Sequence, residues 1–473
     1  MKTPFFFIAF LLVSALSSSA QSWTGLDISN PILNQHDNQL YTVCADKAGN
    51  VYTAGMVFDT GWHTVVGKWD GTSWHSLATG DPLLDSFVQI TRIIADTLDN
   101  IYIVGEFGPS GALNNVVKWD GTSWGKVGAL NVNSEIVGIC FDKHYNLYAA
   151  GEFTDSSGHC YVAKWDGMSW TEVGTGVHAL NVNGDIKCLY VDSSENIYAA
   201  GGFTDSTTYT GGNLYVAKWD GTSWSELGSG VHHQDSSFNT QIWSIVGDVM
   251  GNLYVSGKFI IDSGYNYVAK WDGTSWNKLG TGSHALNANS GINSLSLDLE
   301  GNLYAAGGFT DDSSAFNGNL SVAQWNGASW SYLGSGFYQY WGLDAIHSLY
   351  TDAQGNIYAA GTFTDTTITF TDSSLSYHPV YVAKYTFTPA GVNTTEIGST
   401  HVYPNPAHSS FNIVADNGAL VGADYALCDL MGRVTRRGKL LAQNTSVNIV
   451  DLSPGIYILH LVNSTDVYKI VKE

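Results

Sequence analysis

Short runs of alternating apolar and polar residues recur along most of this chain, with polar turns between them. A period of two predicts β-strands that have one covered face. In the clearest copy, residues 216–219 and 222–227 flank Asp220 and Gly221. An Asp-Gly pair between strand-forming residues predicts a two-residue hairpin, because a type I′ turn needs a positive φ at both positions.

A two-residue turn would fix how the two tryptophans of this hairpin pair. Trp219 would face Thr222. Trp224 would face Ala217, and the two indoles would be diagonal neighbours on one face of the hairpin. That large apolar face has to be covered, and the repetition of the hairpin along the chain supplies the cover.

Three landmarks recur seven times and define the repeat. The first is an Asp followed four residues later by Asn and six residues later by Tyr. Its Asp residues are Asp46, Asp96, Asp142, Asp192, Asp248, Asp298 and Asp352. The second is the end of a Lys-Trp strand, at Trp69, Trp119, Trp165, Trp219, Trp271, Trp325 and finally Tyr385. The third is a Ser-Trp strand, with Trp23, Trp74, Trp124, Trp170, Trp224, Trp276 and Trp330. Four-stranded propeller blades recur at this period, roughly 40 to 50 residues before loop insertions.

Each repeat predicts four strands, called A to D in chain order. In the sixth repeat they are residues 292–297, 303–309, 321–325 and 329–333. A lone D strand at 22–26 begins the series, and the last repeat stops after its C strand at Tyr385. These two fragments make one blade between them, which removes the open edge. The prediction is an all-β fold, a seven-bladed β-propeller closed by pairing of its N- and C-terminal strands.

Changes in composition predict four segments. Residues 1–20 combine Lys2, an apolar run and small residues before the cleavage point, as a secretory signal peptide does, and the run is too short to span a bilayer. The propeller covers residues 21–387, and a linker with Thr, Pro and Gly covers 388–400. Residues 401–473 contain short predicted strands between turns, a pattern typical of a small, Ig-like β-sandwich.

Charge and cysteine content narrow the range of partners. The formal net charge is −22, and residues 21–390 hold 35 Asp and Glu against 12 Lys and one arginine, Arg92 (13 − 35 = −22). Nucleic-acid binding depends on Lys and Arg contacts to phosphate, so we expect no nucleic-acid partner. The five cysteines show no CxxC pair or framework spacing, which argues against a zinc site or a disulfide scaffold.

Two stretches resemble known families. The Asp-x-x-Gly-Asn-(Leu/Ile)-Tyr-x-x-Gly core, as in residues 352–361, resembles the repeat of secreted bacterial β-propellers and, more loosely, the NHL-type propellers. Near the C-terminus, a Tyr-Pro-Asn-Pro run, a Leu-Met-Gly-Arg-Val run, a Leu-Ser-Pro-Gly-Ile-Tyr run and a basic tail follow in order. They resemble the type A sorting domain of the type IX secretion system of Bacteroidota. The matching positions include Tyr403, Pro404, Asn405, Pro406, Gly432, Gly455, Tyr457, Lys469 and Lys472.

This second resemblance implies an export route. The secretion translocon in the outer membrane would recognise the C-terminal domain and then cleave it. The propeller would pass through the periplasm of a Gram-negative bacterium and end either released or attached to surface lipopolysaccharide, and both outcomes stay open. No segment beyond the signal peptide is long and apolar enough to be a predicted transmembrane helix.

Antiparallel blades place the A-to-B and C-to-D turns on one rim and the longer connections on the other. We interpret the repeated Asp and Asn of the first rim as turn formers. The opposite rim, called here the long-loop rim, is where the repeats diverge, and binding usually resides on such loops. Its candidate residues are Trp62, His63, His178, Tyr209, His232, His233, Tyr265, His284, Phe316, Tyr340, Trp341 and Tyr377. Aromatic rings beside polar residues suit sugar faces or a protein partner, or they pack the loops onto the blades.

Metal and catalytic chemistry find little support in the sequence. His178 and His284 occupy the same place in separate blades, too far apart to share zinc, and no loop has EF-hand spacing, although Asp155 and its repeats could help to hold calcium. We therefore predict no metal site and no cofactor.

Sialidase-like chemistry needs several arginines, and the nucleophile elbow, phosphate loop and HExxH motifs are missing. The channel-lining residues Tyr41, Thr91, Val137, Lys187, Trp243, Asn293 and His347 contain no carboxylate pair of the glycosidase type.

The sequence leaves three hypotheses for function. The first is an exported, non-catalytic propeller that binds a glycan or protein on the long-loop rim. The second is a secreted polysaccharide-active enzyme with its site at the channel mouth, which clustered titratable groups in a single deep pocket would favour. The third is a structural surface scaffold without a localised pocket.

Overall fold

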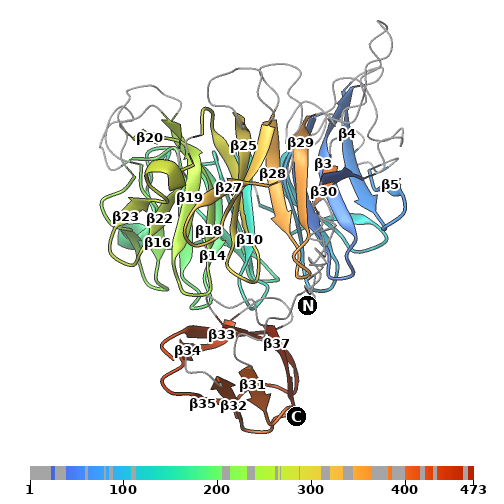
Figure 1. Ribbon diagram of the computed structural model, residues 1–473. Coiled ribbons are helices and arrows are strands. Elements are labelled where there is room, and N and C mark those ends of the chain that lie inside the picture. The colour runs from blue at the N-terminus through green and yellow to red at the C-terminus, as the bar shows by residue number, and fades with distance from the viewer. Residues whose placement is uncertain are drawn as a thin grey trace, which may run out of the picture.

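The computed structural model describes residues 23–26, 39–58, 62–78, 81, 83–84, 89–107, 113–130, 132–204, 214–231, 240–261, 265–266, 268–286, 288–310, 320–333, 345–363, 382–385, 400–415, 421–429, 434–461 and 467–473. Figure 1 shows a ring of sheets and, beside one of its rims, a smaller C-terminal domain. Apart from the 3₁₀ helices η1 (Gly176–His178) and η2 (Gly282–His284), the regular structure of the described residues is all strand. None of the helices in the described part of the chain could cross a membrane.

Seven four-stranded antiparallel sheets form the ring, and each corresponds to one sequence repeat. Blades 1 to 3 are β2 (Gln39–Ala45), β3 (Val51–Phe58), β4 (Trp62–Trp69) and β5 (Trp74–Ser76); β6 (Gln89–Ala95), β7 (Ile101–Phe107), β8 (Leu113–Trp119) and β9 (Trp124–Lys126); and β10 (Ile136–Phe141), β11 (Leu147–Gly151), β12 (Ala163–Trp165) and β13 (Trp170–Glu172). Blades 4 and 5 are β14 (Ile186–Val191), β15 (Ile197–Gly201), β16 (Ala217–Trp219) and β17 (Trp224–Glu226); and β18 (Gln241–Gly247), β19 (Leu253–Lys258), β22 (Ala269–Trp271) and β23 (Trp276–Lys278). Blade 6 is β24 (Ile292–Leu297), β25 (Leu303–Thr310), β26 (Leu320–Trp325) and β27 (Trp330–Tyr332), and blade 7 is β28 (Ala345–Thr351), β29 (Ile357–Thr362), β30 (Val382–Tyr385) and β1 (Trp23–Gly25).

The ring closes by pairing its first strand with its last propeller strand. β1 is antiparallel to β30, with Trp23 opposite Tyr385, and the ring centroids of this pair lie 5.2 Å apart. The backbone N–H of Leu26 extends the pairing by donating to the Val382 carbonyl at 3.0 Å. The predicted all-β propeller and its closure by the terminal strands are confirmed.

The predicted two-residue turn of the C-to-D hairpin is wrong. Trp219 pairs directly with Trp224, so residues 220–223 form a four-residue turn. Asp220 Oδ1 accepts from the backbone N–H groups of Thr222 at 2.8 Å and Ser223 at 2.9 Å. Because the carboxylate binds these donors, the longer turn is stabilised, and a positive φ is recorded at Gly221 alone of its four residues. The indoles still share one face, with ring centroids 5.7 Å apart.

The Asp-Asn-Tyr landmark is a hydrogen-bonded cluster in each A-to-B turn. In blade 1, Asp46 Oδ1 accepts from the Asn50 backbone at 2.8 Å, while Oδ2 accepts from Asn50 Nδ2 at 2.6 Å and the Tyr52 hydroxyl at 2.9 Å. Asp298 repeats the arrangement in blade 6. The interpretation of these residues as turn formers is confirmed, because their polar atoms bind local partners.

Each inner strand carries one β-bulge close to the long-loop rim. In blade 1 the register shifts between Leu40 and Thr42, which leaves Tyr41 as the extra residue. The adjacent Gly55 allows this close approach, because a Cβ there would lie 2.0 Å from the Gln39 carbonyl oxygen. A bulge re-aims the side chain it carries. The bulged residues of the seven blades are Tyr41, Thr91, Val137, Lys187, Trp243, Asn293 and His347.

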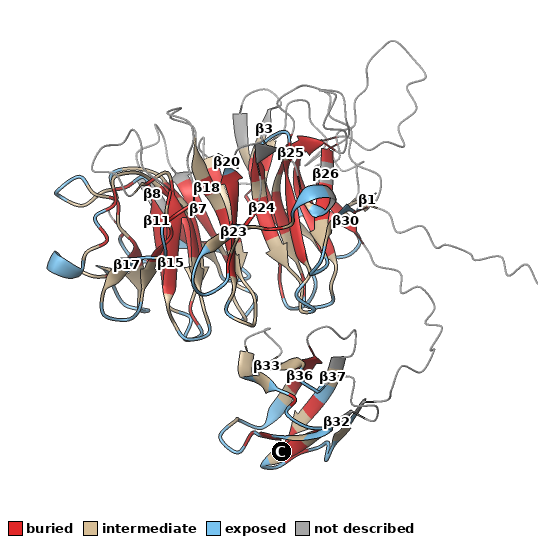
Figure 2. Cartoon of the chain, turned by 60° about the vertical axis from the view of Figure 1, so that its left-hand side comes forward, coloured by how far each residue is buried: buried red, intermediate tan, exposed pale blue. Residues whose placement is uncertain are grey.

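The C-terminal domain contains two sheets. β31 (Thr400–Tyr403), β32 (Ser410–Ala415) and β35 (Asn444–Asn448) form one, and β34 (Val434–Lys439), β33 (Asp424–Asp429), β36 (Gly455–Leu461) and β37 (Val467–Lys472) form the other. Phe411, Leu427 and Leu459 are fully buried in their common core. In both domains, Figure 2 shows buried residues along the strands and exposed residues in the turns. The remaining two-stranded sheet, β20 (Ile260–Ile261) with β21 (Tyr265–Asn266), belongs to blade 5's B-to-C connection.

Candidate functional site

The structure places five of the long-loop-rim candidates in described segments, and the two whose side chains are described lie after different blades. His178 and His284 are exposed and end η1 and η2, which follow blades 3 and 5. Trp62 and His63 begin β4, and Tyr265 begins β21; the backbone of these three is described, but not their side chains. Outside the described residues lie Tyr209, His232, His233, Phe316, Tyr340, Trp341 and Tyr377.

A ring of paired positions surrounds the channel mouth on the long-loop rim. In each blade, the residue that precedes or begins the inner strand pairs with the residue that follows the Tyr-x-x-Gly motif. From blade 1 to blade 7 the pairs are Gln39 with Met56, Gln89 with Glu106, Glu135 with Glu152, Asp185 with Gly202, Gln241 with Lys258, Gly291 with Gly308, and Ala345 with Thr362. Their identities differ from blade to blade, so the radial symmetry of the ring is broken here.

Lys187 is the centre of a polar cluster at this mouth. Its Nζ lies 2.7 Å from Asp185 Oδ2 and 2.9 Å from Glu152 Oε1. Gln241 Nε2 donates to the same Asp185 oxygen at 3.4 Å. The cluster therefore joins blades 3, 4 and 5. Side-chain exposure is 18% for Lys187 and 14% for Asp185, against 43% for Glu152, so Glu152 forms its solvent edge.

The ion pairs keep the Lys187 ammonium charged. Burial lowers the pKa of Lys187, but hydrogen bonds and charge attraction from Asp185 and Glu152 outweigh it, and the net pKa is raised. A lysine that acts as a base or nucleophile needs a lowered pKa. Lys187 is therefore suited to donate hydrogen bonds rather than to accept a proton.

Asp185 is held in a close-fitting position. Its Oδ1 is buried and has no hydrogen-bond partner among the described residues. A Cβ at Gly202 would lie 2.3 Å from that oxygen, so only glycine at this position leaves room for the carboxylate. A buried acceptor without a partner is a place where a water or a ligand hydroxyl gains a hydrogen bond.

A cavity of about 390 Å³ adjoins the cluster and is lined by Glu152, Asp185, Lys187, Gln241 and neighbouring loop residues. Trp243 extends the network, because its Nε1 donates to Gln241 Oε1 at 3.1 Å. The indole lies over Gly291, where a Cβ would be 2.4 Å from the ring. Donors, acceptors and one half-buried indole thus lie on consecutive blades.

Two members of this network were predicted from the sequence and three were missed. Lys187 and Trp243 were recognised as channel-lining residues. Asp185, Glu152 and Gln241 were missed because only the residue after the first apolar residue of each inner strand was assigned to the channel. Pairing each residue after the Tyr-x-x-Gly motif with the start of the inner strand would have revealed the carboxylates.

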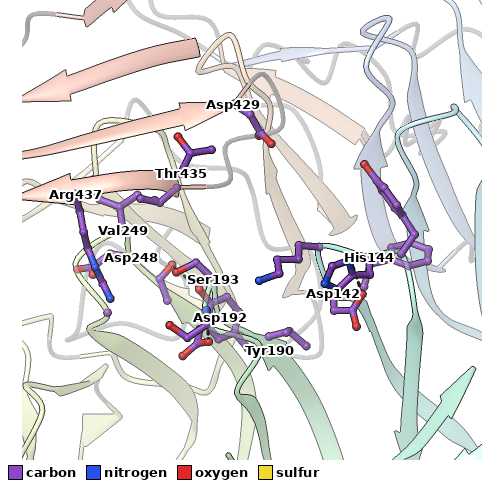
Figure 3. Close-up of a pocket in the computed structure, with 18 of the residues that line it drawn as sticks. Asp142, His144, Tyr190, Asp192, Ser193, Asp248, Val249, Asp429, Thr435 and Arg437 are labelled. Carbon is purple, nitrogen blue, oxygen red and sulfur yellow. Dashed lines mark hydrogen bonds between the residues drawn. The ribbon is translucent and has the colours of Figure 1, made fainter. Parts of the chain in front are cut away.

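A larger cavity of about 800 Å³ lies on the opposite rim, between the A-to-B turns and the C-terminal domain. Figure 3 shows Asp142, Asp192 and Asp248 on its propeller side and Arg437 on its C-terminal side. These three carboxylates already accept hydrogen bonds from the Asn and Tyr of their own turns. The cavity is also lined by residues of the C-terminal domain. Because its three propeller carboxylates are occupied within their own turns, it is the weaker candidate for a binding site.

Most residues of the predicted sorting signal lie around the last strand. Asn405 Oδ1 accepts from the Val471 backbone at 2.7 Å, and Asn405 Nδ2 donates to the carbonyl of Lys469. Gly455 pairs with Lys472. The Tyr457 hydroxyl donates to the Ser453 carbonyl at 2.8 Å. Tyr403, Pro404 and Pro406 are exposed in the Tyr-Pro-Asn-Pro run, whereas Gly432 lies outside the described residues.

Residues 401–473 match the family model of the secretion system C-terminal sorting domain. The resemblance to a type IX sorting domain is thereby confirmed, and the protein is exported by that system to the cell surface or beyond. No curated protein matches the chain.

Several solved structures are similar to the chain, and we name three. Virginiamycin B lyase from Staphylococcus aureus has 10% identity and a TM-score of 0.48, over 77% of this chain and 99% of that chain. PorZ, a surface component of the type IX secretion system of Porphyromonas gingivalis, has 12% identity and a TM-score of 0.40, over 92% and 70%. The β-propeller domain of the trilobed protease from Pyrococcus furiosus has 10% identity and a TM-score of 0.44, over 68% and 91%. These similarities are too distant to assign an activity.

Proposed function

We propose that the exported propeller is a non-catalytic binding module that takes a glycan at the channel mouth of the long-loop rim. The observation that carries the proposal is the Lys187 cluster. It places fixed donors, fixed acceptors and the indole of Trp243 at a part of the rim where three consecutive blades join in a hydrogen-bonded network.

The chemistry of this mouth suits a sugar. Sugar hydroxyls both donate and accept, so they can bind the Lys187 ammonium and the exposed Glu152 carboxylate together. An aromatic ring such as Trp243 offers an apolar surface to the face of a pyranose. The cavity of about 390 Å³ lies within the ordinary size range of small-ligand sites, roughly 300 to 1,000 Å³.

The test is binding of purified full-length protein to a glycan array, followed by calorimetric titration with the glycans that bind. Lys187→Met should lower the affinity at least about tenfold, because it removes a charged donor and releases Asp185. Gln241→Ala should weaken binding without changing the charge. Lys126→Met, which removes an exposed lysine from the outer strand β9, is the matched control and should bind normally.

Two results would count against the proposal. If a protein array gives a partner and the glycan array gives none, the ligand class is wrong. If a glycan binds equally to wild type and to both cluster variants, with their melting temperatures unchanged, the site is elsewhere on the protein.

A secreted polysaccharide-active enzyme is the second candidate, favoured by the convergence of Glu152 and Asp185 on one lysine. The ion pairs count against it, because an acid and base pair needs carboxylates with contrasting environments rather than a shared counter-ion. Release of reducing ends from polysaccharides by wild type, and its loss in Glu152→Gln, would favour the enzyme. Binding without such release would favour the binding module.

A further inference from the structure

A second ring of residues lines the channel beside the bulges. It consists of the residue that directly follows the bulged position in each inner strand: Thr42, Arg92, Gly138, Cys188, Ser244, Ser294 and Ser348. They line a cavity of about 370 Å³ together with the strand residues that follow them. A cavity of this size has room for several waters or for one small ligand.

Four of these residues form a repeated bond between blades. The side-chain oxygen of each accepts a hydrogen bond from a backbone N–H on the inner strand of the next blade. The bonds run from Ile93 to Thr42 at 3.2 Å, from Leu295 to Ser244 at 3.1 Å, from Leu349 to Ser294 at 3.0 Å, and from Val43 to Ser348 at 3.2 Å. In these four blades, one backbone N–H of the inner strand thus donates to a hydroxyl of the neighbouring blade.

Three consecutive blade boundaries lack this bond. The acceptor position holds Arg92, Gly138 or Cys188, and none of these side chains accepts from the next inner strand. By the shared register, the matching amides are those of Ile139, Leu189 and Ile245, which line the same cavity. Among the described residues, no side chain accepts a hydrogen bond from these three N–H groups.

Arg92 is the one arginine among residues 21–390. Protein surrounds it, but its side chain is part-exposed because it faces the channel, and burial lowers the pKa of its guanidinium. It forms no hydrogen bond or ion pair through its side chain with the described residues. Burial raises the pKa of the Cys188 thiol to about 12 despite the opposing charge of Arg92, so that thiol is neutral and is not the counter-ion.

A half-buried cation without a partner has lost part of its hydration without compensation, and a buried donor without an acceptor is costly too. One ligand would satisfy both. A guanidinium matches the geometry of a carboxylate and also binds halides, and strand-edge amides add donors of the same kind. The net charge of −22 repels anions at long range, so any anion held here depends on these local donors.

We propose that the channel binds one small monoanion, a chloride ion or the carboxylate of a small acid, through Arg92 and the backbone amides of Ile139, Leu189 and Ile245. The anion neutralises the guanidinium and replaces the hydroxyl acceptors missing from three blade boundaries. The site is separate from the Lys187 cluster, and the proposal does not depend on the glycan.

The test uses full-length protein in a halide-free buffer of fixed ionic strength. Sodium bromide, as a stand-in for chloride, and sodium acetate are titrated in separate series, each with sodium gluconate making up the salt. Melting temperature and calorimetric heat are measured. We expect saturable binding of bromide or acetate, and the series with the lower dissociation constant identifies whether the ligand is a halide or a carboxylate.

Two variants locate the site. Arg92→Gln should abolish the saturable response, and Arg92→Lys should weaken it tenfold or more because it keeps the charge and loses the fork of donors. Arg437→Gln, at an exposed position of strand β34 in the C-terminal domain, makes the same charge change elsewhere and should respond as wild type does. In halide-free buffer Arg92→Gln should melt no lower than wild type, because the uncompensated charge is gone.

A wild type without saturable binding of either anion would overturn the proposal, and so would an Arg92→Gln variant that retains it. If Arg92→Gln does not fold, crystals of wild type grown in bromide decide the matter. An anomalous peak beside Arg92 supports the site, and its absence at saturating bromide, with acetate also failing to bind in solution, rejects it.

Discussion

Trp23 and Tyr385 lie directly opposite each other across the seam of the ring, although they are 362 positions apart in the chain (385 − 23 = 362). The Trp23 indole also donates to the Leu333 carbonyl of blade 6 at 2.9 Å. One side chain thus completes blade 7 and ties it to its neighbour. Every other blade takes its outer strand from the same repeat, and blade 7 takes it from the N-terminal end of the propeller.

Trp23→Ala should therefore loosen the seam as well as reduce stability. The lost packing and hydrogen bond should lower the free energy of unfolding by about 2–4 kcal/mol. Amide exchange of β1 and β30 should rise well above that of the other blades. Trp224→Ala is the matched control, because Trp224 makes the equivalent bond to the Val173 carbonyl at 2.7 Å within a continuous repeat. It should cost a similar amount without selective exchange at β30, and equal exchange in both variants would contradict a special role for the seam.

The C-to-D turns should contribute to acid sensitivity. Hydrogen bonds from the Thr222 hydroxyl and from the Ser223 and Thr222 amides hold the pKa of Asp220 at about 2, below its ordinary value of 3.8. A lowered carboxyl pKa stabilises the fold fully above the ordinary value, and this contribution is lost as the pH falls from about 4 through about 2. Acid unfolding of wild type, followed by circular dichroism, should show that loss.

Blade 6 provides the control for this prediction. Asn326 occupies the place of Asp220 there, and its Oδ1 accepts from the Ala328 and Ser329 amides at 3.0 Å. Asp220→Asn should therefore fold normally at pH 7 and lose less stability than wild type between pH 4 and pH 2. An unchanged acid transition would show that the turn carboxylate makes no net contribution.

The fold could be predicted from sequence because its signals are local and repeated. The Asp-Asn-Tyr turns occur in each repeat and a tryptophan pair in six of the seven, and the position of Trp23 relative to Tyr385 specified the closure. The turn at Asp220 was predicted wrongly because side-chain hydrogen bonds, rather than backbone preference, determine its length. The Lys187 cluster was only partly predictable, since Glu152 and Gln241 come from neighbouring blades and the position of Asp185 depends on cross-strand register.

Gly202→Ala tests whether the position of Asp185 matters for ligand binding. The new Cβ would lie 2.3 Å from Asp185 Oδ1, so the carboxylate must rotate and its contact with Lys187 must weaken. We expect a loss of glycan affinity of about tenfold and a stability cost of roughly 1–3 kcal/mol. The measurements are calorimetric titration and chemical unfolding.

Gly308→Ala is the matched control, because Gly308 holds the same place in blade 6 and the nearest atom to its Cβ would be the Ser290 hydroxyl oxygen, at 2.9 Å, with the next atom at 3.6 Å. That hydroxyl can rotate away, so affinity should be unchanged. Equal affinity of Gly202→Ala and wild type would show that the orientation of Asp185 is irrelevant to the ligand.

His347 should make the propeller less stable in mild acid. Burial lowers the pKa of this channel residue to about 4, and its ring lies 5.7 Å from Tyr41, whose pKa burial raises, so neither ring is charged near neutrality. A lowered histidine pKa gives a contribution that is complete above the ordinary value of 6.5 and is lost as the pH falls through about 4. The whole contribution is at most roughly 3–4 kcal/mol, from 1.36 kcal/mol per unit of pKa.

His347→Gln removes the titrating ring and keeps a polar side chain in the channel. The variant should lose less stability than wild type between pH 6.5 and pH 4, measured by urea unfolding at several pH values. The ring protons of His347 should titrate near pH 4 in NMR spectra. His284→Gln, which changes an exposed histidine on the same rim, should leave the pH dependence as it is in wild type. A His347 ring that titrates near 6.5 would mean that the channel is wet enough to solvate the charged imidazole.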